Sequence, residues 1–335
     1  MPHHATHSGY DKLTNHIQCD VIEPSEIYHL LGLCPERILA QFRRTAGTWY
    51  NSYALRRELQ NLPGFFLKKN QIYHYLYGED SYHYSGYLNP RRSNKIVATY
   101  HCPPEKFHAI NCGTRHLKML DAVVILAPNQ EAIFKDIVLP ERVHLIPHGI
   151  DTAYFTPGDP VARHPRHCLF VGTHLRDFNG LREVISCMNR LDADISFSIV
   201  TSAEYFPLFK LLRNVSLLTV IPEDELLRLY RTSTLLLLPM LDCTANNAVL
   251  EAMGCGLPVI TSDAGGIGLY LPPEAGVLIP PGDTAQMAFK AIELINDPLR
   301  RTAMSAACRK TAETFDWSVI AQKMYALYDR LMMEK

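Results

Sequence analysis

Short apolar runs of strand length alternate with segments of helical periodicity along nearly the whole chain, and this alternation constrains the fold more than any other feature. It is typical of βαβ units, in which helices join parallel strands. The 335 residues exceed what one hydrophobic core usually supports, so we expect two domains. The sequence therefore predicts an α/β protein whose two domains are each built on a parallel sheet.

The strand candidates are short runs rich in apolar residues. In the first half they are Cys19–Ile22, Gln71–Tyr77, Lys95–His101, Ala122–Ala127 and Val143–Pro147. In the second half they are Cys168–Val171, Ile195–Thr201, Leu217–Ile221, Leu235–Pro239 and Pro258–Thr261. Residues 1–7 are too short and too rich in histidine for a strand, so we expect the first strand of the N-terminal domain to be missing or atypical.

Proline and glycine are concentrated between residues 149 and 166, which indicates a domain boundary. We therefore expect an N-terminal domain over residues 1–150 and a C-terminal domain over residues 151–315. The last segment places Trp317, Met324 and Leu331 on one helical face. It predicts a helix over residues 316–335 that packs back on the first domain.

Composition excludes several classes of protein. Lys and Arg total 33 against 34 Asp and Glu, so overall charge predicts no nucleic-acid partner. The nine cysteines form no CxxC pair and no Cys/His cluster at zinc spacing, so we expect reduced thiols, no metal site and a cytoplasmic location. No apolar run reaches the roughly 18 residues that span a bilayer, and we expect no secretory signal at the N-terminus.

One segment, Asn246–Ile260, concentrates the chemistry. It reads as a polar loop, a short helix with the single carboxylate Glu251, a glycine turn and a buried strand. This order places Glu251 at the carboxyl ends of parallel strands, where α/β sheets bind ligands. A carboxylate there can accept hydrogen bonds from the two vicinal hydroxyls of a ribose. Alternatively, Glu251 stabilises exposed N–H groups at the start of its helix.

The stretch from Asn246 to Thr261, followed by Asp263-Ala264-Gly265-Gly266, resembles the signature of family 4 glycosyltransferases, also called glycosyl transferases group 1. Three other stretches resemble the same family: the hinge at Val143–Asp151, the strand and phosphate loop from Leu169 to Gly180, and the start of the closing helix at Phe315-Asp316-Trp317. The resemblance implies the GT-B fold, in which two Rossmann-like domains flank a ligand cleft.

The resemblance also assigns roles to residues. Glu251 is expected to bind the ribose of the donor, and Asn246, Asn247 and Gly172 its phosphates, with help from amides at Ala245–Ala248. Gly9 is expected to let the backbone approach the diphosphate, although it also suits a plain turn. His101, in a Thr-x-His sequence, is expected near the transferred sugar, although it is one of fifteen histidines.

Apart from His148, which stands where Asn is usual in the hinge, the sequence departs from the family pattern at three positions. Thr173 and Asn179 stand where the family has Arg and Lys, and Cys243 stands where it has a second Glu, eight residues before Glu251. A departing diphosphate needs positive charge nearby. Arg176 is our candidate for that charge, with Arg182 and Arg115 as alternatives, unless all three are ordinary solvated arginines. Asp242 is the candidate for the missing carboxylate, and we interpret Cys243 as a packed side chain rather than a nucleophile.

The resulting hypothesis is a retaining, metal-independent glycosyltransferase that moves a sugar from a nucleoside-diphosphate sugar to an unidentified glycan, lipid or small molecule. It predicts a donor substrate but no cofactor, with His101, Asp242 and Arg176 as catalytic residues. The alternative is a GT-B protein without transfer activity that acts as a nucleotide-binding or partner subunit. A sugar-nucleotide epimerase is weaker, because the extra carboxylates it needs are not identifiable.

Residues 36–70 carry seven basic side chains against two acidic ones, with aromatic residues between them. A basic and aromatic helical surface suits peripheral contact with anionic lipid at the inner face of a membrane, or capture of an anionic acceptor. A solvated face over an aromatic core explains the same composition.

Overall fold

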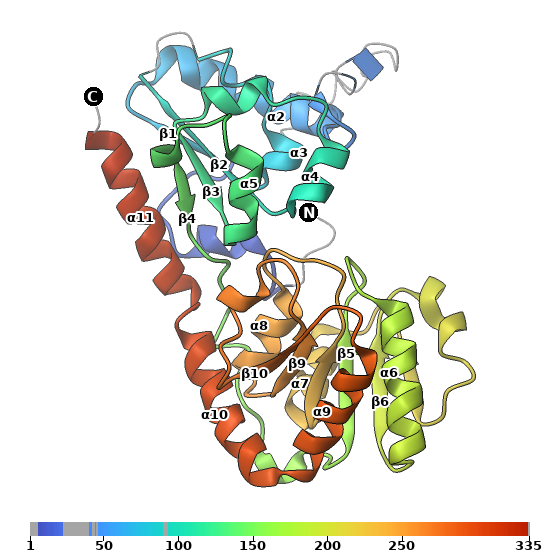
Figure 1. Ribbon diagram of the computed structural model, residues 1–335. Coiled ribbons are helices and arrows are strands. Elements are labelled where there is room, and N and C mark those ends of the chain that lie inside the picture. The colour runs from blue at the N-terminus through green and yellow to red at the C-terminus, as the bar shows by residue number, and fades with distance from the viewer. Residues whose placement is uncertain (1–5, 23–39, 42–43, 45, 90–92, 334–335) are drawn as a thin grey trace. The chain divides into compact units, whose positions relative to one another are not determined.

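The computed structural model describes residues 6–22, 40–41, 44, 46–89 and 93–333 (Figure 1). The chain divides into two compact units. One, here called the C-terminal unit, comprises Met1–Lys12 and Gly149–Val319. The other, the N-terminal unit, comprises Leu13–His148 and Ile320–Lys335. Each unit contains one parallel sheet, with four strands in the N-terminal unit and six in the C-terminal unit among the described residues. The predicted α/β class with two parallel sheets is confirmed.

The sheet of the N-terminal unit has the order β1-β2-β3-β4, so each strand pairs with the next one along the chain. Its strands are β1 (Ile72–Tyr75), β2 (Lys95–Tyr100), β3 (Ala122–Ile125) and β4 (Val143–Leu145). Its helices are α2 (Ser52–Leu67), α3 (Gly78–Ser81), α4 (Pro104–Ile110) and α5 (Glu131–Phe134), with short 3-10 turns at Arg115–Met119, Pro128–Gln130 and Pro140–Arg142. A 3-10 helix at Tyr10–Asn15 precedes them.

The last helix, α11 (Trp317–Met333), belongs to the N-terminal unit from Ile320 onward. Its Tyr328 hydroxyl lies 2.5 Å from Nδ1 of His74 on β1, and the other ring nitrogen of His74 lies 2.7 Å from Oγ1 of Thr99 on β2. Leu327 and Leu331 of the helix are buried. The end of the chain is therefore held on the small sheet by apolar burial and by a histidine that links one helix to two strands.

The sheet of the C-terminal unit has the order β10-β9-β8-β5-β6-β7. Its strands are β5 (His167–Val171), β6 (Ser196–Val200), β7 (Val215–Leu218), β8 (Leu235–Leu238), β9 (Val259–Ser262) and β10 (Gly276–Ile279). Its helices are α6 (Phe178–Leu191), α7 (Glu223–Thr232), α8 (Asn247–Gly254), α9 (Thr284–Asn296) and α10 (Pro298–Glu313), with 3-10 turns at Pro160–Ala162, Ala203–Leu208 and Ile267–Leu269.

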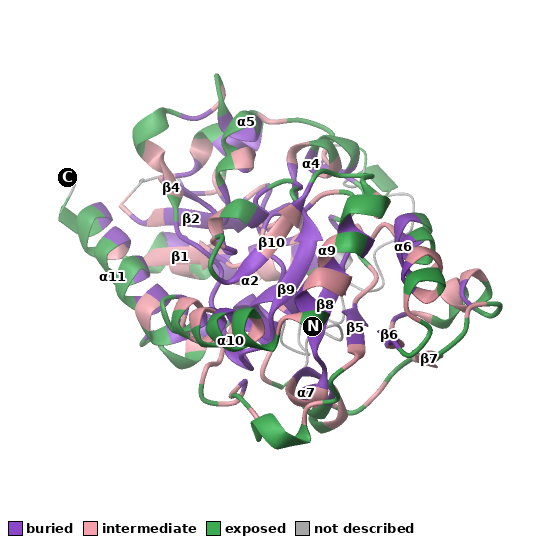
Figure 2. Ribbon diagram, turned by 60° about the horizontal axis from the view of Figure 1, so that its bottom comes forward, coloured by how far each residue is buried: buried purple, intermediate pink, exposed green. Residues whose placement is uncertain are grey.

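This strand order fixes where a ligand can bind in the C-terminal unit. The chain proceeds outward from β5 in one direction and outward from β8 in the other, so the order reverses between these two strands. Right-handed crossovers in opposite directions place α6 and α8 on opposite faces of the sheet. In Figure 2 the central strands β8 and β9 are buried, whereas α6 and α10 expose their outer sides. The carboxyl ends of β5 and β8 form the switch point at which open α/β sheets bind ligands.

Three expectations need correction. Residues 19–22 form no strand, and Val21 and Ile22 are exposed, because no neighbouring strand covers this short apolar run. Strand β10, which extends the sheet beside β9, was not predicted, because a four-residue strand that begins with Gly276 and ends before Pro280 carries little periodicity. Finally, Met1–Lys12 group with the C-terminal unit rather than with residues 13–148. The described residues before Tyr10 form no strand.

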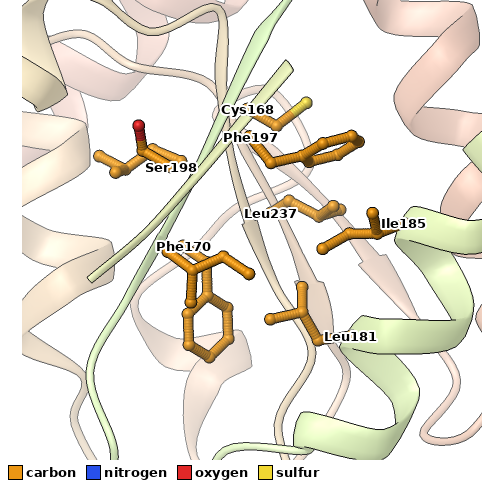
Figure 3. A pocket seen from close by; sticks show the side chains of 9 residues that line it. Cys168, Phe170, Leu181, Ile185, Phe197, Ser198 and Leu237 are labelled. Atoms are coloured by element: carbon orange, nitrogen blue, oxygen red, sulfur yellow. The ribbon is translucent and has the colours of Figure 1, made fainter. Parts of the chain in front are cut away.

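A small gap lies inside the larger sheet's core, between β5, β6, β8 and α6 (Figure 3). Its lining is almost entirely apolar and includes Phe170, Leu181, Ile185 and Leu237. The gap has no room for a water molecule. The gap is therefore part of ordinary core packing, and the polar groups that could bind a ligand lie at the switch point.

Candidate functional site

The loops after β5 and β8 are joined by two backbone hydrogen bonds. The N–H of Asp177 donates to the carbonyl of Pro239 at 3.1 Å, and the N–H of Leu241 donates to the carbonyl of Leu175 at 3.0 Å. The first loop begins with Gly172 at a φ of +104°, a conformation that favours glycine. These two hydrogen bonds bring Arg176 of the first loop close to the start of α8, which follows the second loop.

Arg176 is held in place by several acceptors. Its Nε donates to the carbonyl of Val171 at 3.1 Å, Nη1 to the carbonyl of His174 at 3.0 Å, and Nη2 to Oδ1 of Asn246 at 3.3 Å. A Cβ atom at position 172 would lie 2.7 Å from Nη2, so glycine leaves the space that the guanidinium fills. Burial lowers the pKa of Arg176 to about 10, which still leaves it cationic at neutral pH.

The start of α8 lies beside this cation. The Asn246 side chain caps the helix by accepting the N–H of Val249 at 3.3 Å, and its amide nitrogen lies 2.9 Å from the sulfur of Met240. The helical hydrogen bonds of α8 begin with the N–H of Leu250, which donates to the carbonyl of Asn246. The N–H groups of Asn247 and Ala248 therefore precede the first helical bond, where an anion is stabilised. The Asn246 side chain itself is occupied by the cap and Arg176.

Glu251, one turn further along α8, is 5% exposed. Its Oε2 accepts a hydrogen bond from the hydroxyl of Tyr230 at 2.7 Å, and its Oε1 accepts one from the hydroxyl of Ser8. Burial raises the pKa of the Glu251 carboxyl, and the two hydroxyl donors counteract that rise. The sequence singled out Glu251 but not Tyr230, because a tyrosine on the apolar face of a helix gives no sign that its hydroxyl reaches a carboxylate.

The substituted position Cys243 is buried, and its thiol donates to the carbonyl of Ala264 at 3.3 Å. Burial raises its pKa to about 12, so the thiol is neutral. Asp242 turns onto its own loop, since its Oδ1 accepts the N–H of Cys243 at 2.8 Å. A Cβ atom at Gly265, whose φ is +57°, would lie 2.3 Å from that oxygen. Glycine at 265 is therefore required for the Asp242 loop to pack as it does.

The other candidate cations lie elsewhere. Thr173 makes hydroxyl contacts with Thr201 at 3.1 Å and Ser202 at 3.2 Å. Asn179 and Arg182 are exposed on α6. Arg115 belongs to the N-terminal unit. Of the three arginines considered from the sequence, the structure brings Arg176 to the switch point.

His101 follows β2 in the N-terminal unit and has a fixed orientation. Its Nε2 lies 2.7 Å from the carbonyl of Leu76 and must donate, since a carbonyl only accepts. Its ring stacks on Tyr77 with centroids 4.6 Å apart, and its backbone N–H donates to the buried carboxylate of Glu79. Gly9, by contrast, lies in the C-terminal unit, buried, at a φ of +113°.

The described residues contain neither a metal-binding cluster nor a membrane-spanning helix. No group of three or more His, Cys, Asp or Glu residues among them is arranged to hold a metal ion. Within the same ranges, no helix is both long and apolar enough to cross a bilayer. The described cysteines form no disulfide with one another.

Residues 165–297 match the family described as Glycosyl transferases group 1. Over 216 residues the chain is 28% identical to D-inositol 3-phosphate glycosyltransferase 1 of Catenulispora acidiphila, which covers 56% of this chain and 52% of that protein. The chain thus spans about half the length of the curated relatives it matches. The family match over residues 165–297 includes β5, the switch point and all of α8.

Solved structures agree on the architecture. Sucrose-phosphate synthase from Thermosynechococcus elongatus superimposes with a TM-score of 0.68 at 21% identity and covers 84% of this chain and 79% of its own. A glycosyltransferase from Rickettsia africae gives a TM-score of 0.64 at 14% identity, over 95% of this chain and 85% of its own. At these identities the likeness concerns the fold, which is the GT-B fold.

Proposed function

This chain belongs to the glycosyl transferases group 1 family, and from that premise we propose that it is a retaining glycosyltransferase. It takes a sugar from a nucleoside-diphosphate sugar and transfers it to an acceptor without the help of a metal ion. The bond between the anomeric carbon and the diphosphate breaks, and the bond to the acceptor oxygen forms on the same face of the sugar. The acceptor proton leaves with the diphosphate.

The observation that carries this proposal is the grouping of Arg176, the start of α8 and Glu251 at one switch point. Arg176 reaches Asn246 at 3.3 Å, Asn246 caps α8, and Glu251 follows on the same helix. A guanidinium beside N–H groups that precede the first helical bond suits a diphosphate. A carboxylate one turn further along suits the ribose hydroxyls attached to that diphosphate. The spatial order of these groups matches the order of groups in a nucleoside diphosphate.

Within this proposal Arg176 replaces the positive charge that Thr173 and Asn179 do not supply. It stabilises the diphosphate as negative charge develops on it. Gly172 and Gly9 allow the backbone to approach the phosphates. Because Nε2 of His101 donates to the carbonyl of Leu76, its Nδ1 accepts a hydrogen bond from a hydroxyl of the transferred sugar. Asp242 acts as the carboxylate on the sugar side in place of Cys243.

The test is a donor screen followed by substitutions. Calorimetry with UDP-, GDP- and ADP-sugars should find one class that binds, and a coupled assay should detect slow hydrolysis of that donor. Arg176→Gln should lower kcat by about 100-fold, whereas Arg176→Lys, which retains a charge, should lose less. If no donor binds to the unaltered protein, the proposal is wrong.

A second function is favoured by one specific observation. Where the family pattern has a second Glu, this chain has the neutral, buried thiol of Cys243. A protein that binds the nucleotide but no longer transfers the sugar, and serves as a subunit of an active transferase, would retain Glu251 and lose that carboxylate. Donor binding with no turnover, together with stable co-purification of a transferase, would select this function. Turnover abolished by Asp242→Asn would reject it.

We also propose that the N-terminal unit approaches its acceptor at the cytoplasmic face of an anionic membrane. Helix α2 provides the surface for this approach, and its inner side buries Ala54, Asn61 and Phe65. Glu58, the only acidic residue of this helix, is also buried on that side. By helical spacing, the opposite side carries Arg56, Gln60 and Leu67, and Tyr53 and Arg57 lie along its edge.

The outer side of α2 therefore combines positive charge with exposed apolar groups. Tyr53 is 47% exposed and Leu67 83%, and the Arg57 guanidinium lies 4.9 Å from the centre of the Tyr53 ring. Lys68 and Lys69 follow the helix and are exposed. Basic residues beside aromatic and aliphatic ones suit the interface of an anionic bilayer. The second acidic residue of this region, Glu36, lies outside the described residues.

Vesicle co-sedimentation tests this surface. The protein should bind vesicles that contain phosphatidylglycerol more than pure phosphatidylcholine vesicles, and added salt should weaken the binding. Lys68→Gln combined with Lys69→Gln and Leu67→Ser should reduce the bound fraction several-fold. Arg190→Gln, an equally exposed cation on α6, is the matched control and should have no effect. Equal binding by all variants would show that α2 is a solvated face.

A further inference from the structure

We propose that residues Thr6–Ser8 act as an internal competitor for the donor nucleoside and cover Glu251 until a nucleotide displaces them. The inference rests on the proposed function, because it assumes that Glu251 binds a ribose. All the residues involved belong to the C-terminal unit.

The segment is attached first to the start of α7. The backbone N–H of Thr6 donates to Oε2 of Glu223 at 3.1 Å, and that of His7 donates to Oε1 of the same carboxylate at 2.8 Å. Both oxygens of Glu223, the first residue of α7, are thereby used to hold two successive amides. This two-point attachment orients the segment and directs the side chain that follows.

His7 is then held as a flat ring. Its imidazole stacks on Tyr154 with centroids 3.6 Å apart and planes 1° from parallel. Its Nδ1 lies 2.8 Å from Oδ2 of Asp151. The hydroxyl of Tyr154 donates to Asp224 at 3.1 Å, which fixes the ring on which His7 lies. A stacked heteroaromatic ring with a nitrogen on a carboxylate has the contacts that a protein commonly gives to a nucleobase.

Ser8 completes the sequence of contacts at Glu251. Its hydroxyl donates to Oε1, while Oε2 accepts from Tyr230. Tyr230 is fully buried and so approaches from the core, whereas Ser8 is partly exposed and approaches from the solvent side. With Glu251 itself 5% exposed, Ser8 covers the side from which a ligand would reach the carboxylate.

The segment therefore presents, in order, a stacked heteroaromatic ring and a hydroxyl on Glu251. A nucleoside presents the same two groups, a base and the hydroxyls of its ribose. The Ser8 hydroxyl and a ribose hydroxyl cannot both bind Oε1 of Glu251 from the same side. The apparent affinity for a donor then equals the intrinsic affinity multiplied by the fraction of molecules in which the segment is displaced.

The test uses the full chain and three nucleotides, UDP, GDP and ADP, in isothermal titration calorimetry. The double variant His7→Ala/Ser8→Ala should bind its preferred nucleotide about 3- to 10-fold more tightly than the unaltered protein, because the competitor is lost. The control His108→Ala/Ser186→Ala, which removes an exposed histidine and a half-buried serine far along the sequence, should leave the affinity unchanged.

Hydrogen exchange gives a second measurement. The amides of Thr6 and His7, which are bonded to Glu223, should exchange faster when the nucleotide is present. Unchanged or weaker binding by His7→Ala/Ser8→Ala overturns the inference and leaves the proposed function intact. If neither the unaltered protein nor the double variant binds any of the three nucleotides, the proposed function falls and the inference falls with it.

Discussion

Two buried glutamates, Glu251 in the C-terminal unit and Glu58 in the N-terminal unit, differ in the groups that donate hydrogen bonds to them. Glu58 has no exposed surface and accepts the N–H groups of His83, Tyr84 and Ser85 at 2.8 to 2.9 Å. It also accepts the hydroxyl of Tyr50 at 2.5 Å. Glu251 accepts two side-chain hydroxyls and no backbone group among the described contacts.

Burial raises the pKa of both carboxyls, so burial alone does not separate them. The donors do. Backbone amides of a loop cannot be exchanged for a ligand without unfolding that loop, whereas the Ser8 hydroxyl can rotate or move away. The comparison teaches that a carboxylate bound by replaceable side-chain donors is the better candidate for a ligand site.

The largest expected effect follows from Glu58→Gln. An amide side chain cannot accept all four hydrogen bonds, so buried N–H groups lose their acceptor. The free energy of unfolding of the N-terminal unit should fall by about 3 kcal/mol. Hydrogen exchange of the β2 amides measures this loss within the unit. A loss below about 1 kcal/mol would show that solvent replaces the carboxylate.

The matching change, Glu251→Gln, should affect stability little and binding strongly. Donor affinity should drop about 10- to 100-fold, because a hydrogen bond to a charged group is lost. Titration calorimetry with the preferred nucleotide measures this drop, and exchange of the β8 amides should remain near that of the unaltered protein. If exchange increased as much as in Glu58→Gln, the contrast between the two carboxylates would be wrong.

Acid should destabilise the N-terminal unit through its buried histidines. Burial lowers the pKa of His74 and His116 to about 3 and of His83 to about 4. Unfolded histidines bind protons near pH 6.5, so this contribution to stability is complete above that pH and is lost as the pH falls toward 4. The buried carboxyls Glu58 and Glu79, whose pKa values are raised, act in the opposite direction.

His116→Leu isolates the histidine contribution, since the carboxyls are present in both proteins. Between pH 7 and pH 4.5 the variant should lose about 2 kcal/mol less stability than the unaltered protein. Urea unfolding followed by circular dichroism at the two pH values gives the difference. Parallel loss in both proteins would mean that His116 stays neutral on unfolding or gains a partner on acidification.

The smallest expected effect concerns Arg182, which the sequence offered as an alternative to Arg176. It is exposed on α6, away from the contacts that hold Arg176. Arg182→Gln should change kcat and donor affinity by less than about twofold, because an exposed charge contributes little. A loss comparable to that of Arg176→Gln would move the phosphate site toward α6.

Much of the fold was predictable because buried parallel strands appear as short apolar runs. Nine of the predicted runs contain or overlap an observed strand, for example Lys95–His101 and β2. The prediction failed at Cys19–Ile22, where an apolar run lacks a neighbouring strand. It also missed β10, a four-residue strand that begins with a glycine and is followed by a proline. Whether such a short segment forms a strand depends on pairing with a neighbouring strand rather than on local hydrophobicity.

The sequence by itself determined the α/β class, the resemblance to glycosyl transferases group 1 and the position of Glu251, because glycines, a helix and a buried strand must follow one another at fixed spacing around the switch point. Only the tertiary structure decided that Arg176 of one loop reaches Asn246 of another, and that Ser8 and Tyr230 meet on Glu251. These partners are separated by 21 to 243 residues. Such contacts depend on how loops from different strands converge, which local spacing does not encode.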